Sequence, residues 1–311
     1  MKHDPSIRRQ VLRGIAHNRT PGSHFAGNFL DISFDQVASG DTRLSLEAGP
    51  HCIDADGQAD TGALAMLADF ALATSIRAEL DPATRLATVS MTLELSDAPR
   101  TGVLKAAATL HGFAGRGYGR VGRSRVVISG GAGEIGFGSG TFMILKPPPN
   151  VTLYPMPHRR HGDAPPPVIA ENELRPDEMR ILRHAEAMLD RAAPGRESFL
   201  RHFWGFLPRQ NPAGASCAMM NGPHVGNRVG HAQGGILLGL AAATASCALP
   251  SSWALTGISG AFISPGEGSV LRARSTILHH GRQTSVIRTQ VTGRNRRRVL
   301  EVMTTHAHRQ S

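Results

Sequence analysis

Residues 54–69 read Asp54-Ala-Asp-Gly57-Gln-Ala-Asp60-Thr-Gly-Ala-Leu-Ala-Met-Leu-Ala-Asp69, and residues 227–242 read Asn227-Arg-Val-Gly230-His-Ala-Gln233-Gly-Gly-Ile-Leu-Leu-Gly-Leu-Ala-Ala242. The two stretches align without a gap at a constant offset of 173 residues, from 54 to 227 and from 69 to 242. In each, a turn-like Asp/Asn-x-x-Gly segment leads into an apolar run long enough for a helix. A repeat of this kind predicts two copies of one structural unit.

The two copies differ at their polar positions, and the differences are complementary. The first copy has a carboxylate, Asp69, where the second has Ala242. The second copy has an amide, Gln233, and a Gly-Gly pair at the helix entrance, where the first has Asp60 and Thr-Gly. Each copy lacks what the other keeps, so we expect one composite site built from both.

The flanking sequence also repeats, since Val103-Leu-Lys-Ala106 aligns with Val270-Leu-Arg-Ala273 at an offset of 167 residues. Apolar periodicity predicts helices over 5–17, 62–80, 176–193 and 234–248. Alternation and turn residues predict strands within 25–47 and over 86–95, 103–112, 117–129, 134–145, 203–207, 216–220, 253–263, 269–278, 284–292 and 298–307. The order of strand, helix and four strands therefore occurs twice.

A proline-rich segment separates the two units and predicts a semi-rigid linker. We therefore expect an N-terminal domain over 1–149, a Pro-rich linker over 150–170 and a C-terminal domain over 171–311. The 311 residues leave room for two ordinary cores.

The composition limits location and partners. No apolar run is long enough to span a bilayer, and the basic N-terminus has no signal-peptide core, so we expect a cytoplasmic protein without membrane insertion. The three cysteines suit a reducing compartment. The net charge of +10 admits nucleic acid, a phosphorylated ligand such as coenzyme A, or a solvated basic surface. Because aromatic residues are few and do not interleave with the basic ones, we expect no nucleic-acid partner.

The sequence predicts neither a metal nor a cofactor. The chain has fifteen histidines, but none has HExxH spacing or lies beside a carboxylate cluster on a predicted helix. Gly117-Tyr-Gly-Arg-Val-Gly122 satisfies the GxGxxG pattern, yet it falls between two predicted strands with no helix after it.

A long helix entered through such a turn and followed by antiparallel strands resembles the PaaI-like (phenylacetate-pathway) acyl-CoA thioesterases of the hotdog fold. Leu67-Ala68-Asp69 is similar to the end of their helix motif, and Gly281-Arg-Gln283 resembles one of their strand motifs. The resemblance implies an α+β, tandem (double) hotdog chain, with two long central helices wrapped by a continuous, mainly antiparallel β-sheet. It also implies a homo-oligomer of double-hotdog chains.

In that family the site forms between two hotdog units. Carried over by position, Asp69 matches the catalytic carboxylate, Thr88 a hydroxyl that positions water, Asn227 the turn amide and Gly234 the oxyanion-hole glycine, while Gln233 replaces the usual histidine. Arg282 and Gly235 are the candidates for binding coenzyme A. The reciprocal site would contain Asp54, Asp60, Thr61, Ala242 and Leu255, and we expect it to be inactive.

The resemblance implies hydrolysis of acyl-CoA thioesters to the free acid and CoA, with Asp69 as general base or as nucleophile. The alternative is a non-catalytic acyl-CoA or lipid sensor with a decayed site, which the missing histidine favours. Retention of Asp69 opposite an intact Gly-Gly turn favours the enzyme. A hotdog hydratase would need a histidine near Asp69 in the sequence, and none is present.

Overall fold

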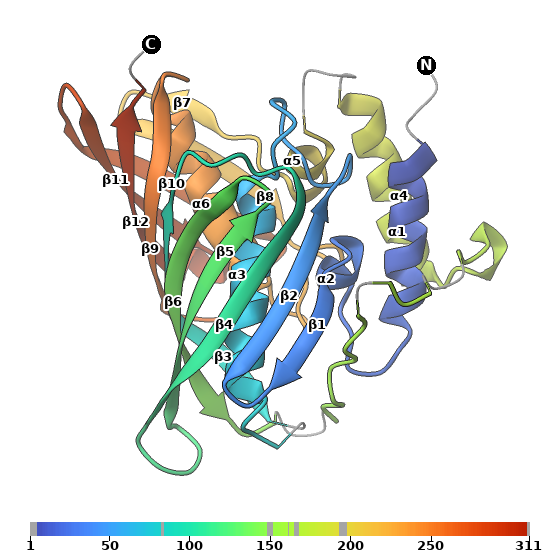
Figure 1. Ribbon diagram of the computed structural model, residues 1–311. Coiled ribbons are helices and arrows are strands. Elements are labelled where there is room, and N and C mark those ends of the chain that lie inside the picture. The colour runs from blue at the N-terminus through green and yellow to red at the C-terminus, as the bar shows by residue number, and fades with distance from the viewer. Residues whose placement is uncertain are drawn as a thin grey trace.

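The computed structural model describes residues 5–81, 84–147, 152–160, 162–164, 168–192 and 198–309. A twelve-stranded sheet wraps around two long helices, α3 (Thr61–Arg77) and α6 (Gly234–Cys247), as Figure 1 shows. The strands of the first repeat are β1 (Ser33–Ala38), β2 (Asp41–Ala48), β3 (Arg85–Leu95), β4 (Gly102–Ala114), β5 (Val121–Gly130) and β6 (Gly133–Leu145). Those of the second are β7 (Arg209–Asn211), β8 (Gly214–Met220), β9 (Trp253–Phe262), β10 (Val270–His280), β11 (Thr284–Thr292) and β12 (Arg298–His308).

The sheet is antiparallel and nearly symmetric about its centre. Its order is β1-β2-β4-β5-β6-β3-β9-β12-β11-β10-β8-β7, so the equivalent strands of the two repeats follow one another in the same order outward from the centre. The two halves join where β3 pairs with its repeat equivalent β9, from Ser90 opposite Ala261 to Glu94 opposite Gly257. The predicted α+β class, with two central helices wrapped by one continuous antiparallel sheet, is confirmed.

The central helices are buried on nearly every side because almost all of their residues are apolar or small. Each begins at a polar residue that caps the free N–H groups of the first turn. Asp60 accepts a hydrogen bond from the Gly62 N–H, and Gln233 accepts from the N–H groups of Gly235 and Ile236.

Glycines let the two helices pack backbone to backbone. A Cβ atom on Gly235 would lie 2.7 Å from the Met66 Cα, and one on Gly239 would lie 2.7 Å from the Gly62 Cα. Both pairs belong to the same antiparallel register, in which the first two turns of one helix pack against the first two turns of the other. Asp69, one turn beyond Met66, therefore comes to the N-terminus of α6.

Each repeat begins with a longer helix followed by a short one, and the sequence predicts only the longer helix of each pair. The first repeat has α1 (Pro5–Asn18) and α2 (Phe25–Phe29), and the second has α4 (Pro176–Arg191) and α5 (Phe199–Trp204). Figure 1 shows α1 and α4 side by side at one edge of the molecule. The strand prediction within 25–47 is therefore wrong for its first part, because α2 occupies 25–29. The predicted strand over 203–207 is also wrong, because α5 ends at Trp204 and residues 205–207 belong to no strand.

The described residues do not decide the domain boundaries. The division into 1–149, 150–170 and 171–311 stays a prediction, since the sheet is continuous across it. The linker prolines Pro148, Pro149 and Pro165–Pro167 lie outside the described residues. Within the described ranges, no helix has the length and apolar character that a membrane crossing requires.

Candidate active site

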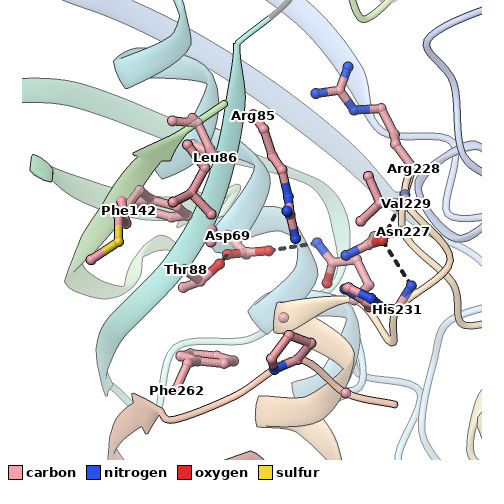
Figure 2. Close-up of a pocket in the computed structure, with 18 of the residues that line it drawn as sticks. Asp69, Arg85, Leu86, Thr88, Phe142, Asn227, Arg228, Val229, His231 and Phe262 are labelled. Carbon is pink, nitrogen blue, oxygen red and sulfur yellow. Dashed lines mark hydrogen bonds between the residues drawn. The ribbon is translucent and has the colours of Figure 1, made fainter. Parts of the chain in front are cut away.

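Asp69 lies buried in the middle of α3, with a side chain 4% exposed, and its carboxyl group contacts both repeats. Its Oδ2 accepts a 2.6 Å hydrogen bond from the Gln233 Nε2 of the second repeat. Its Oδ1 accepts a 3.2 Å hydrogen bond from the Thr88 Oγ1 on β3. Figure 2 shows Asp69 and Thr88 facing the turn that carries Asn227 and His231. The structure thus brings together four of the predicted residues: Asp69, Thr88, Gln233 and Gly234.

The N-terminus of α6 fixes the orientation of the Gln233 amide. Its Oε1 accepts hydrogen bonds from the Gly235 N–H at 2.6 Å and the Ile236 N–H at 3.3 Å. Because backbone N–H groups can only donate, the oxygen must face the helix and the NH₂ group must face Asp69. Gln233 therefore links the helix terminus to the carboxyl group and holds that group in place.

Gly234, the first residue of α6, lies directly against Asp69. A Cβ atom at this position would lie 3.1 Å from the Thr88 Oγ1, closer than most Cβ contacts, and 3.4 Å from the Asp69 Oδ2, at van der Waals distance. Within the described part of the chain, the Gly234 N–H has no hydrogen-bond acceptor, whereas the next two N–H groups of the helix donate to Gln233. This N–H is therefore available to a ligand at the positive end of the helix dipole.

Thr88 owes its position to a β-bulge. The register of β3 against β6 shifts between Thr88 and Ser90, so Val89 is the extra residue. Thr88 and Val89 both line the cavity beside Asp69. The same irregularity recurs in β9, whose register against β12 shifts around Thr256. Bulges of this kind redirect side chains next to functional sites.

Asn227 holds the turn that leads into α6. Its Oδ1 accepts hydrogen bonds from the N–H groups of Val229 at 3.0 Å and His231 at 3.1 Å. Asp54 forms the same turn in the first repeat, accepting from Asp56 and Gln58 at 3.0 Å each. With its oxygen occupied, Asn227 has only its amide N–H groups to offer the cavity it lines.

These residues line a cavity of about 420 Å³ between the repeats. Apolar side chains form much of its wall, namely Phe70, Leu86, Phe142, Leu237 and Phe262 among others. A pocket of this size with a few convergent polar groups is typical of small-molecule sites. The cavity is also lined by residues that no sequence motif marks: Arg77, Arg85, Arg228, His24 and His231.

Burial changes the acid–base properties of Asp69. Removal from water raises its pKa to about 6, although the hydrogen bonds from Gln233, Thr88 and the Gly235 backbone oppose the shift. A carboxyl group with this pKa is still ionised near neutral pH and is a stronger base than an exposed aspartate. Perturbed carboxyl groups in clefts are frequent at catalytic sites.

Two further predicted residues lie elsewhere. Arg282 is exposed in the turn between β10 and β11 and is not among the residues that line the cavity. Gly235 is buried against α3, where it permits the close helix contact described above. The arginines that line the cavity come from α3, β3 and the 227–234 turn. In the sequence, only Arg77 could have been found, because it lies two turns after Asp69 on the same predicted helix.

The reciprocal position between the repeats has different chemistry. Asp60, the repeat equivalent of Gln233, has its Oδ2 2.7 Å from the Arg201 Nε. Ala242, the equivalent of Asp69, is buried and offers no polar group. A Cβ atom on Gly62 would lie 2.8 Å from the Phe206 ring and 3.2 Å from the Trp204 ring. The start of α3 is thus surrounded by aromatic side chains and an ion pair. At the start of α6, the equivalent position has the Asp69 carboxyl group and the Gly234 N–H.

Comparison with known protein families gives a match in the second repeat. Residues 223–309, which include the 227–234 turn, α6 and β9–β12, match the model of the acyl-CoA thioesterase N-terminal domain. No curated protein matches the chain by sequence.

Solved structures match over nearly the whole chain. A conserved protein of unknown function with the hotdog fold from Alicyclobacillus acidocaldarius is 12% identical, with a TM-score of 0.55 over 93% of this chain and 99% of that one. The tesB protein of Mycobacterium avium subsp. paratuberculosis is 12% identical, with a TM-score of 0.54 over 89% and 96%. The 12:0-ACP thioesterase of Umbellularia californica is 8% identical, with a TM-score of 0.52 over 86% and 93%. The predicted double hotdog fold is confirmed.

Proposed function

We propose that the chain hydrolyses acyl-CoA thioesters to the free acid and CoA, at one composite site formed by Asp69 and Thr88 of the first repeat and Gln233 and Gly234 of the second. One observation carries the proposal: a buried carboxyl group with a raised pKa lies next to a backbone N–H at a helix N-terminus that has no acceptor among the described residues. The thioesterase domain match over residues 223–309 and the thioesterases among the structural neighbours support this reaction class.

The arrangement supplies the two things that thioester hydrolysis needs. Asp69, as general base, takes a proton from water, and the hydroxide adds to the thioester carbonyl carbon. Alternatively the carboxylate itself adds to the carbonyl carbon, departure of the thiolate leaves an Asp69 anhydride, and water then cleaves the anhydride to the free acid and restores the carboxylate. In either case the Gly234 N–H donates to the carbonyl oxygen as it becomes negative. The C–S bond then breaks, and the thiolate leaves and takes up a proton.

The absence of the usual histidine is compatible with this chemistry. A thiolate leaves readily without an acid, because thiols are much stronger acids than alcohols, with a pKa of about 8.5 for a free cysteine thiol. Gln233 cannot supply a proton, but its amide N–H holds the Asp69 carboxylate at 2.6 Å. We assign Gln233 and Asn227 to positioning, the first of the carboxylate and the second of the turn that presents Gly234.

The test is release of free thiol from a panel of acyl-CoAs with short, long and aryl acyl groups. The proposal predicts turnover of at least one class, at a rate that depends on Asp69. Saturable binding of acyl-CoA without turnover of any member would exclude the enzyme and leave a non-catalytic sensor.

The hydrolysis rate should rise with pH and level off above neutrality. Burial raises the pKa of Asp69 to about 6, and only its ionised form acts as base or nucleophile. The rate should therefore fall about tenfold for each pH unit below 6 and stay constant above about 7. A profile of kcat/KM from pH 4.5 to 8.5 measures this. A rate that is independent of pH between 5 and 7 would contradict the assigned role.

We further propose that the chain works as a homo-oligomer in a reducing compartment such as the cytoplasm. Large apolar side chains exposed on paired strands of the outer sheet face support assembly, among them Phe137, 53% exposed, opposite Val127, 40% exposed. The free thiols Cys52 and Cys217 support a reducing compartment. Light scattering should give a mass that is a multiple of 33.1 kDa and that falls in a Phe137→Glu variant. A monomer in the wild type would refute the assembly.

A further inference from the structure

The cavity holds more positive charge than its proposed chemistry needs. The described residues that line it include three arginines, Arg77, Arg85 and Arg228, but only one carboxylate, Asp69. In the described chain, no Asp or Glu lies within ion-pair distance of any of the three guanidinium groups. Arg77 donates only to the Thr84 carbonyl and Arg228 only to the Tyr154 carbonyl.

Two polar atoms of this wall are buried without a partner in the described residues. They are the Arg77 Nε and the His24 Nδ1. Burial, together with the neighbouring charge of Arg228, lowers the pKa of Arg77 to about 9. Burial, with the charges of Arg228 and Arg77, likewise lowers the pKa of His24 to about 4. Unpaired buried cations are costly, and the cost is offset when an anion binds.

The arginines lie at a definite place relative to the reaction centre. Asp69, Ala73 and Arg77 line the cavity from one stripe of α3. Arg77 lies eight positions after Asp69, which at the helical rise corresponds to roughly 12 Å. Figure 2 shows Arg85 reaching from β3 into the space between Asp69 and the Asn227 turn, with Arg228 beyond it.

We propose that the cluster of Arg77, Arg85 and Arg228 binds an anionic group of the thioester ligand, a carboxylate or a phosphate, on the Arg77 side of Asp69 and within roughly two helical turns of the carbonyl that reacts there. The guanidinium fork matches both groups through paired N–H···O bonds. The inference rests on the proposed function. The anion is either a carboxylate at the far end of the acyl chain or a phosphate of CoA.

The experiment measures dissociation constants by calorimetry for thioether analogues, in which a CH₂ group replaces the thioester carbonyl. Octyl-CoA and 7-carboxyheptyl-CoA differ only in a terminal carboxylate in place of a methyl group, whereas octyl-CoA and octyl-pantetheine differ in the 3′-phospho-ADP part, which carries all of the phosphates. Wild type is compared with Arg77→Met and with Arg85→Met, a change that breaks no hydrogen bond of the described structure. Arg123→Met, at an exposed position on β5, is the matched control.

Both cavity variants should weaken binding of the anionic analogue by about 10- to 100-fold, and the control should leave it unchanged. If the cavity variants lose only the tighter binding of 7-carboxyheptyl-CoA relative to octyl-CoA, the anion is the carboxylate of the acyl group. If they lose only the tighter binding of octyl-CoA relative to octyl-pantetheine, the anion is a phosphate. Unchanged constants in both cavity variants, or no saturable binding to wild type, would overturn the proposal. Because the readout is binding, it is independent of turnover: arginine-dependent binding without thioester cleavage would refute the proposed hydrolysis alone.

Discussion

Asp69→Asn is expected to lower thiol release from the preferred acyl-CoA by about 100- to 10,000-fold, with a smaller effect on KM. The asparagine keeps the shape of the side chain. Its Oδ1 can still accept from the Gln233 Nε2, and its NH₂ group can donate to the Thr88 Oγ1. What it loses is the ability to take a proton or to attack carbon. A kinetic comparison under saturating and limiting substrate measures both effects.

The repeat supplies the control for this variant. Asp54 forms the equivalent of the Asn227 turn, so Asp54→Asn places in the first repeat the residue that the second already uses. Its rate should equal that of the wild type. Equal losses in Asp69→Asn and Asp54→Asn would mean that the effect is structural and not chemical.

The stability of Asp69→Asn provides a second check on the same residue. The pKa of Asp69 is higher in the folded chain than the usual 3.8, so folding favours the neutral form. The stability that this group contributes is complete below about pH 4 and is lost as the pH rises through 6. At pH 8 the asparagine variant should therefore be more stable, by up to about 3 kcal/mol. Urea denaturation at pH 4 and 8 measures the difference.

Gly234→Pro is expected to lower the rate by about 100-fold relative to Gly234→Ala. Both substitutions add a Cβ atom against the Thr88 hydroxyl, but only proline also removes the backbone N–H. Proline suits the first position of a helix, and the preceding Gln233 already has the extended conformation that proline requires, with φ −70° and ψ 142°. The difference in rate between the two variants therefore reports the loss of the Gly234 N–H, the proposed oxyanion donor.

The readout is kcat/KM for the two variants, with thermal unfolding as the control for folding. Equal rates in the two variants would show that the Gly234 N–H does not stabilise the transition state, and would remove the oxyanion hole from the mechanism.

The sequence predicts the fold well where the pattern is local and repeated. The apolar runs after Asp60 and Gln233 predict both central helices, and the capping residues mark where they begin. The two short helices are missed because aromatic-rich segments such as 203–207 look like strands. Their helical form depends on distant partners: Phe29 lies 5.0 Å from Phe203 and 6.2 Å from Phe199 between ring centroids. Ser198, which caps α5, and Gly205, with φ +74° at its end, are the local signals for a helix there.

The candidate site is predictable only as a list of residues. Complementary losses at Asp69/Ala242 and Asp60/Gln233 predict that the site takes one half from each repeat. They do not reveal that the Gln233 oxygen is occupied by the helix, which leaves its NH₂ group for Asp69. They also miss the cluster of Arg77, Arg85 and Arg228, because its members lie on three elements that meet only when the helices cross.

The most direct test of the composite site is a crystal structure of Asp69→Asn with the acyl-CoA that the wild type hydrolyses. The account predicts one thioester per chain, with its carbonyl oxygen within hydrogen-bond distance of the Gly234 N–H and its carbonyl carbon facing residue 69. A thioester bound at the reciprocal position near Asp60, or one whose carbonyl contacts neither Gly234 nor residue 69, would contradict it.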